Sequence, residues 1–168
     1  MRNKLLYWQI AGFLFTGIAG TLLHFLYDWS NQNIFVASFS AVNESIWEHM
    51  KLLFVPMFIF AILERQFIGA HYEIFWCVKL VGILLGIMLI PVLYYTYTGI
   101  SGISKDWINV AIFFIATAAT YLLETWLFRN VSTFCIAPLW ALFILCLLAS
   151  AFVILTFIPP EIPLFQTP

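Results

Sequence analysis

The stretch IFWCVKLVGILLGIMLIPVLYYTY, residues 74–97, contains a single charged side chain, that of Lys79. About 20 apolar residues in an α-helix cross a hydrocarbon core about 30 Å thick. The apolar residues run continuously instead of alternating with polar ones, which favours a helix over a strand of a barrel. Residues 74–97 therefore predict a membrane-spanning helix.

Four further apolar runs of similar length occupy most of the remaining chain. They are residues 5–27, 43–68, 107–128 and 134–158. The chain is 64% hydrophobic and 9% charged, whereas a soluble domain has about 25% charged residues. So few polar groups could not cover a soluble globule, and lipid must solvate the apolar surface. We expect an all-α, polytopic bundle of about five transmembrane helices, forming one integral membrane domain over residues 1–168.

The net charge bears on nucleic-acid binding, and the positions of the cysteines bear on disulfide and metal binding. The net charge is −1, and nucleic-acid binding needs clustered Lys and Arg, so we expect no nucleic-acid partner. Cys77, Cys135 and Cys146 lie in apolar runs, without the spacing of a disulfide framework or a metal site. We therefore expect three free thiols that pack as small apolar groups.

Basic residues near the ends of the predicted helices are unequally divided between the two sides. One side has Arg2, Lys4, Arg65 and Arg129, and the other has Lys51 and Lys105. Cytoplasmic loops carry the excess of Lys and Arg. The predicted orientation is a cytoplasmic N-terminus and an extracytoplasmic C-terminus. In the first connection, the apolar residues 34–36 are too few to span, so we expect them to lie at the surface or to dip into the protein.

Polar side chains gather on both sides of that first connection. The candidate ligand-binding residues are His24, Asp28, Asn43, Glu44, Glu48, His49 and Lys51. Antiparallel helices joined by a short loop would bring them to one membrane edge, which is the outer edge in the predicted orientation. His24 and Asp28 share a helix face, while Glu44 falls on one stripe with Glu48 and Lys51.

Three interpretations of this cluster remain open. The first is a helix start, with a cap at Asn43, capping-box spacing of Ser45 and Glu48, and a Glu48–Lys51 pair. The second is a site that binds or moves a cation or a small polar ligand. The third is a metal-assisted or acid–base active site, with His24, Asp28 and His49 as metal candidates. No specific motif such as H-E-x-x-H distinguishes the third from the others.

A second set of polar residues lies inside two of the predicted spans. Lys79 and Glu124 lie at matching depths from the same side. Gly82 and Gly86 share the helix stripe of Lys79 in a GxxxG pattern, which allows close approach of another helix. We expect Lys79 to bridge Glu124 as a structural contact; the alternative is that both side chains extend to the interface. The Gly82/Gly86 face is also a candidate contact for a homo-oligomer.

Three motifs resemble those of a family of small bacterial membrane proteins that is catalogued as domain of unknown function 6512. They are GTLLHFLYDW at 20–29, VNESIWEHMKLLFVP at 42–56 and PPEIPLF at 159–165. The resemblance runs along the whole chain. It implies a multi-span protein of the bacterial plasma membrane and supplies neither an activity nor a cofactor.

The sequence thus favours a membrane protein with a polar His/Asp/Glu site at the extracytoplasmic ends of the first two helices. We expect this site to bind or move a cation or a small polar ligand. A metal-dependent membrane hydrolase and a non-catalytic accessory or assembly subunit are the alternatives.

Overall fold

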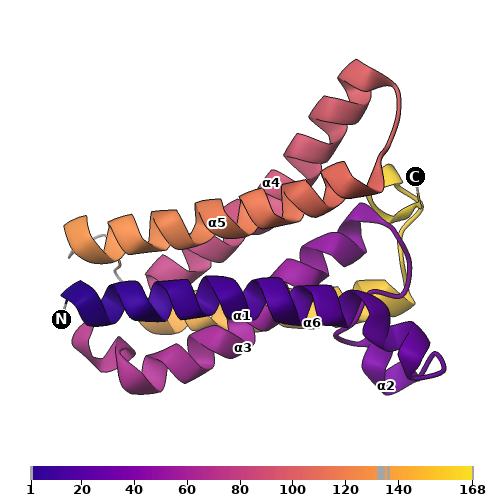
Figure 1. Cartoon of the computed structure of the whole chain (residues 1–168). Helices are drawn as coiled ribbons and strands as arrows, with labels where there is room; N and C mark the ends of the chain where they lie inside the picture. Colours follow the sequence, from indigo (N-terminus) through magenta and orange to yellow (C-terminus); the bar gives the residue numbers. More distant parts are fainter. Residues whose placement is uncertain (1, 132–134, 136, 168) are drawn as a thin grey trace.

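Five long helices lie side by side in the computed structural model, which describes residues 2–131, 135 and 137–167 (Figure 1). They are α1 (Arg2–Trp29), α3 (Ile46–Phe67), α4 (Phe75–Ser101), α5 (Asp106–Asn130) and α6 (Pro138–Phe157). Each is long and apolar enough to cross a membrane. The prediction of an all-α bundle with about five spanning helices is confirmed. The predicted start of the last span, Phe134, lies outside the described residues.

Three short helices complete the description: α2 (Ile34–Ala37), η1 (Gly69–His71) and η2 (Pro163–Phe165). The N-terminus and η1 lie at one end of the bundle, here called the N-terminal end. The C-terminal tail and α2 lie at the other, here called the C-terminal end (Figure 1).

Local sequence signals set several of the helix ends. Ser45 caps α3, because its Oγ accepts a hydrogen bond of 3.4 Å from the Glu48 backbone N–H. Gly102 ends α4 in the left-handed conformation (φ 70°), which glycine adopts without steric cost. Pro138 occupies the first turn of α6, where its missing N–H is not needed.

Helix α3 is the centre of the bundle. Of its candidate span, 61% of the residues are buried, against 22% for α1 and 17% for α6. Leu53, Phe54 and Met57 of α3 form the core with Ile83 and Ile87 of α4. Helix α1 packs on α3 and α5, whereas α5 and α6 each pack mainly on α4.

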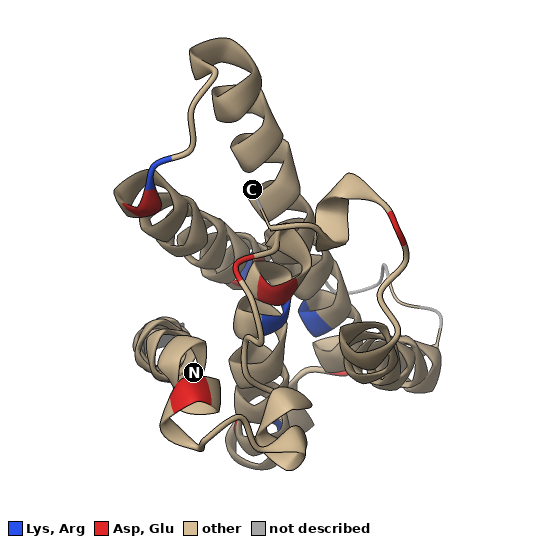
Figure 2. Cartoon of the chain, turned by 90° about the vertical axis from the view of Figure 1, so that its right-hand side faces the viewer, with Lys and Arg blue, Asp and Glu red and all other residues tan. Residues whose placement is uncertain are grey.

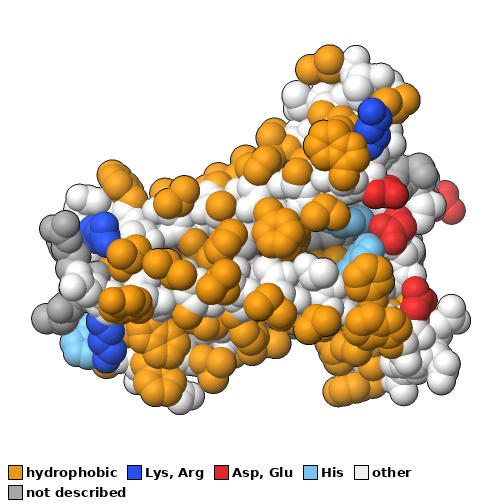
Figure 3. All heavy atoms as spheres, viewed as in Figure 1, with side chains coloured by type: hydrophobic (Ala, Val, Ile, Leu, Met, Phe, Trp, Pro, Cys, Tyr) orange, Lys and Arg blue, Asp and Glu red, His pale blue; other side chains and the backbone are white. Residues whose placement is uncertain are grey.

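The outer surface of the bundle is apolar between two polar ends. Figure 3 shows hydrophobic side chains along the helices, basic side chains at the N-terminal end and mostly acidic ones at the C-terminal end. Large exposed apolar residues occur on all five long helices, for example Ile18, Leu63, Met88, Leu122 and Leu147. Lipid is the solvent that suits this surface. The five helices and their apolar surface are those of a multi-pass membrane protein.

The first connection folds back onto the bundle. Ile34 and Phe35 are exposed, whereas Ala37, at the end of α2, is buried. Ser40 ties the connection to α1, since its Oγ accepts from the Tyr27 N–H at 3.1 Å and its hydroxyl bonds to the Leu23 carbonyl. The apolar patch thus lies at the surface, and the segment after it dips into the protein.

Two cysteines are paired, so the expectation of three free thiols is wrong. Cys77, in the first turn of α4, forms a disulfide with Cys135, and their Cα atoms are 6.0 Å apart. The sequence separation of 58 residues gave no sign of this pairing. The two residues meet only because α5 returns antiparallel to α4. Cys146 is free and exposed on α6.

The Gly82/Gly86 face is used within the chain. A Cβ atom on Gly82 would lie 2.6 Å from Glu124 Cγ, and one on Gly86 would lie 2.5 Å from Thr120 Oγ1. The two glycines therefore let α5 approach α4 closely, as the sequence predicted. Because this face is buried by α5, the predicted homo-oligomer contact through Gly82 and Gly86 loses its basis.

Candidate functional site

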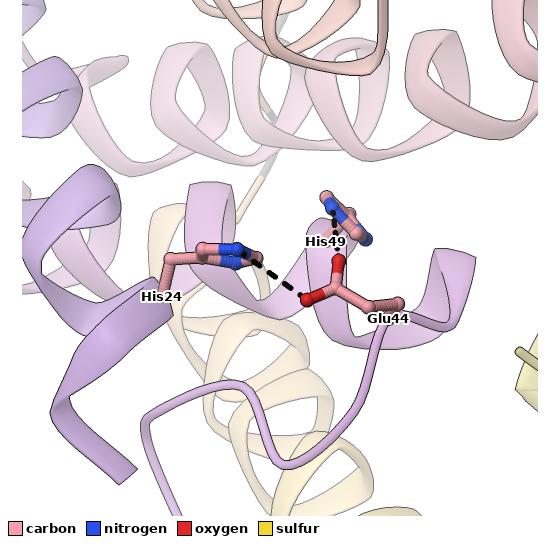
Figure 4. Close-up of side chains that lie close together, drawn as sticks. All are labelled: His24, Glu44 and His49. Atoms are coloured by element: carbon pink, nitrogen blue, oxygen red, sulfur yellow. Dashed lines mark ion pairs between the residues drawn. The ribbon is translucent and has the colours of Figure 1, made fainter. Parts of the chain in front are cut away.

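Three potential metal ligands converge at the C-terminal end of the bundle (Figure 4). His24 comes from α1, Glu44 from the turn before α3, and His49 from the first turn of α3. His24 Nε2 is 3.5 Å from Glu44 Oε1, and His49 Nε2 is 3.7 Å from Glu44 Oε2. One donor atom of each residue lies within 4.8 Å of the other two. The carboxylate thus lies between two imidazole rings.

The local cap geometry directs Glu44 toward the histidines. Asn43 Oδ1 accepts a hydrogen bond of 2.9 Å from the Ser45 N–H, and Ser45 then caps the helix that begins at Ile46. Glu44 therefore precedes the helix. Its predicted position on one stripe with Glu48 and Lys51 is wrong, because that stripe assumed helical geometry from residue 43 onward.

A second contact fixes the orientation of the His49 ring. His49 Nδ1 lies 2.9 Å from the Ser45 carbonyl oxygen. A carbonyl oxygen only accepts, so this contact places a proton on Nδ1. In the neutral ring, Nε2 then has a free lone pair, and it is Nε2 that faces the Glu44 carboxylate.

The spacing of these atoms fits a shared cation better than direct hydrogen bonds. Hydrogen bonds between N–H and O have donor–acceptor distances of about 2.7–3.2 Å. Two ligand atoms at about 2.0–2.2 Å from a tetrahedral zinc ion are about 3.4 Å apart. The observed separations of 3.5 and 3.7 Å, each to a different oxygen of the Glu44 carboxylate, are close to the second value.

The cluster opens into a cleft of about 760 Å³ between α1, α3 and α5. Ser104, Asp106 and Asn109 add polar groups to its lining, and Phe25, Phe113 and Phe114 are among its apolar residues. In Figure 3 the histidine and acidic side chains at this end lie together on the visible face. The donor atoms are therefore reachable from outside: Glu44 is 65% exposed, His24 26% and His49 17%.

The structure does not bring all seven predicted residues together. Glu48 and Lys51 are buried on another side of α3, with Lys51 Nζ 2.6 Å from Glu48 Oε2. Lys51 also donates to the Ala37 carbonyl at 2.9 Å and to Thr156 Oγ1 at 2.8 Å. This pair therefore links α3 to α2 and α6.

The other two predicted residues lie at the surface. Asp28 is exposed one turn beyond His24 on α1, and Asn43 is exposed in the turn before α3. The carboxylate that lies between the two histidines is that of Glu44, not that of Asp28.

A separate network of charged residues is buried toward the N-terminal end. The predicted contact between α4 and α5 is present, with Lys79 Nζ 2.5 Å from Glu124 Oε2. Lys79 Nζ is also 2.5 Å from Glu64 Oε2 of α3, and Gln9 of α1 donates to Glu64 Oε1 at 2.9 Å. Figure 2 looks along the helices from the C-terminal end and shows acidic and basic positions on several helices near the middle of the view.

Sequence reasoning missed Glu64 and Gln9 as members of this network. Glu64 precedes Arg65 near the end of a span, which is typical of an interfacial pair. Its spacing from the core residues Phe60 and Met57 was the available signal, because all three share one helix face.

The fold and the cleft together define a class: a multi-pass helical membrane protein with a histidine–carboxylate cluster at one end. The chain belongs to a family described as "Family of unknown function (DUF6512)", which matches residues 1–168. Comparison with curated proteins and with solved structures gives no match.

Proposed function

We propose that this membrane protein binds a divalent transition-metal ion, with zinc as the best fit, through His24, Glu44 and His49. The observation that supports this most is the carboxylate of Glu44 between two imidazole Nε2 atoms, at 3.5 and 3.7 Å. Two histidines and one carboxylate form a common ligand set for zinc in sites that keep an open coordination position.

The surroundings of His49 support the same assignment. Metal-binding histidines usually donate their second ring N–H to a carbonyl or carboxylate, which fixes the tautomer. His49 does so through Nδ1 to the Ser45 carbonyl. Without a cation, the Nε2 lone pair of the neutral ring would point at a negatively charged oxygen, which is unfavourable. A bound cation turns that repulsion into attraction.

The open side of the cluster suggests what the ion is for. Three protein ligands leave a fourth position, and structural zinc sites usually fill that position with a fourth side chain. Here His24, Glu44 and His49 all line the cleft of about 760 Å³, so a ligand in the cleft could reach an ion that they held. An ion held in this way can exchange with the solution or with a ligand in the cleft, as binding or movement of a cation requires.

We also infer that the N-terminal end faces the cytoplasm of a bacterial cell, so that the metal site is extracytoplasmic. Lys51 is buried and paired with Glu48, so it no longer counts among the free basic residues of the C-terminal end. The C-terminal end then has Lys105, and the N-terminal end has Lys4, Arg65 and Arg129. The excess of basic residues at the N-terminal end is therefore larger than the sequence alone indicated.

Zinc binding to the purified protein tests the proposal. Calorimetric titration in detergent should give one tight site per chain, and His24→Ala and His49→Ala should each weaken it at least tenfold. His71→Ala removes an exposed histidine at the opposite end and serves as the matched control. Unchanged affinity in both cluster variants would exclude the site.

The size of the cleft favours one further candidate, a metal-dependent hydrolase. Its volume of about 760 Å³ far exceeds that of an ion and falls in the range of about 300–1,000 Å³ that is typical of small-molecule sites. Its lining, polar near the cluster and aromatic at Phe113 and Phe114, suits an amphipathic substrate. A bound zinc ion supplies an activated water, and Asp106 is the nearby carboxylate for proton transfer. Lipid hydrolysis that needs zinc and is lost in Asp106→Asn, with zinc binding retained, would support this candidate over simple binding.

A further inference from the structure

The buried network of Glu64, Lys79 and Glu124 contains more negative than positive charge. The side chains of both glutamates are 0% exposed and that of Lys79 is 2% exposed. If all three were ionised, the site would have a net charge of −1 away from water. An uncompensated charge in such a place strongly destabilises the folded protein.

The neighbouring charged and titratable groups do not supply the missing positive charge. Arg65 is directed to the Phe75 ring, 5.8 Å from its centroid, and Arg129 is exposed. Burial raises the pKa of the Tyr72 hydroxyl, while Arg129 lowers it by less and Glu64 adds to the rise. Tyr72 therefore stays neutral. The hydroxyl of Tyr121 is engaged with Thr16 Oγ1 at 2.9 Å.

The network also has fewer hydrogen-bond donors than its buried acceptors need. Lys79 contacts Glu64 and Glu124, and the centroid of the Tyr121 ring lies 5.5 Å from its Nζ. Gln9 gives its amide N–H to Glu64 Oε1. Among the described residues, no hydrogen-bond donor reaches Glu124 Oε1 or Gln9 Oε1, and Glu64 Oε2 has only its ion-pair contact with Lys79, although all three atoms are buried. Buried acceptors are normally satisfied.

One additional proton would correct both deficits. A proton on Glu124 Oε1 makes the network electrically neutral. It also turns Glu124 Oε1, which no donor in the described part of the chain reaches, into an O–H donor. Gly82 leaves the room for this carboxyl group, because a Cβ there would lie 2.7 Å from Glu124 Oε1.

We propose that Glu64, Lys79 and Glu124 form a proton-binding site that holds one exchangeable proton on Glu124 at neutral pH. Release leaves the Glu124 carboxylate and one proton, which passes to water. Lys79 is four residues into α4, about 6 Å along the axis from the helix start, so the path to the N-terminal end is short. The site is independent of the metal cluster at the opposite end.

Infrared spectroscopy of the full chain in lipid nanodiscs tests this proposal directly. At neutral pH the wild-type protein should show the carbonyl-stretch band of a buried protonated carboxyl group. The band should shift in D₂O and disappear on alkaline titration. Glu124→Gln should abolish it, whereas Glu161→Gln, which changes an exposed glutamate in the C-terminal tail, should leave it unchanged.

The wild-type spectrum alone decides the matter if the Glu124 variant does not fold. The absence of a protonated carboxyl band at neutral pH would show that both glutamates are ionised and would overturn the proposal. A band that persists in Glu124→Gln, or one that does not respond to D₂O and pH, would overturn it as well.

Discussion

His49 Nε2 lies 3.7 Å from Oε2 of Glu44, a residue that lies just outside the helix that carries His49. Ser45 lies between them in the chain: its Oγ caps α3, and its carbonyl oxygen accepts a hydrogen bond from His49 Nδ1–H. Residues 44–49 therefore supply two potential metal ligands, Glu44 and His49, and the hydrogen bond that orients the His49 ring. His24 then completes the cluster from α1.

The negative charge of the Glu44 side chain should matter to zinc binding. Glu44→Gln removes the charge and should weaken binding at least tenfold, because the neutral amide is a poor zinc ligand. Asp28→Asn removes a carboxylate from an exposed position one turn away and should change the affinity less than twofold. Competition with a fluorescent zinc chelator measures both variants. Equal losses in the two variants would argue for a diffuse electrostatic effect.

Gly82→Ala should destabilise the bundle. The new Cβ would lie 2.6 Å from Glu124 Cγ, so either the Glu124 side chain or α5 must move. Overpacking of this kind costs about 1–3 kcal/mol. A lower midpoint of thermal unfolding in detergent is the expected result.

Gly99→Ala is the matched control for this test. Gly99 is on the same helix, and nothing lies within 4 Å of the position that its Cβ would take. Replacing a helical glycine with alanine in open space stabilises the helix by up to about 1 kcal/mol. An unfolding midpoint of Gly82→Ala at or above that of Gly99→Ala would contradict the close approach of α5 to Gly82.

Removing one member of the buried Glu48–Lys51 pair should lower the thermal stability of the protein more than removing both. Lys51→Met leaves Glu48, which is 2% exposed, without its cation. Breaking a buried pair in this way costs about 3–5 kcal/mol. The double variant with Glu48→Gln should recover much of the lost thermal stability. A double variant less stable than Lys51→Met would show that the ion pair itself is not what Lys51 contributes.

The proposed orientation makes a prediction for the Cys77–Cys135 pair. This disulfide lies near the N-terminal end, which we assign to the cytoplasm, where glutathione and thioredoxin keep thiols reduced. Both residues should therefore be thiols in growing cells and should oxidise to the disulfide after lysis in air. Rapid acid quenching followed by maleimide gel-shift assay measures the fraction. A pair that is fully oxidised in cells would favour the opposite orientation.

The spanning helices could be predicted because their evidence is local. The apolar run of α4, for example, exceeds the length needed to cross a bilayer and contains only Lys79 as a charge. The contact of Lys79 with Glu124 was also predictable, since their depths in two antiparallel helices agree. The contact of Glu64 with Lys79 could not be predicted, because it depends on how α3 packs against α4 and α5.

The candidate metal site was predictable only in part. His24 and His49 could be assigned to one membrane edge from the order of the helices. The direction of Glu44 depends on a helix start only two residues later, and helix ends are the least certain feature of a sequence prediction. The separation of Glu48 and Lys51 from the cluster has the same cause. The disulfide depends on a contact across two helices, for which the sequence offers no local sign.

X-ray absorption spectroscopy at the zinc edge identifies the atoms that bind the ion. For the protein with one equivalent of zinc, we expect light-atom ligands at about 2.0–2.2 Å, with the multiple scattering of two imidazole rings. The imidazole contribution should fall by half in His24→Ala. A first shell of sulfur at about 2.3 Å, or a spectrum without imidazole scattering, would contradict a site built from His24, Glu44 and His49.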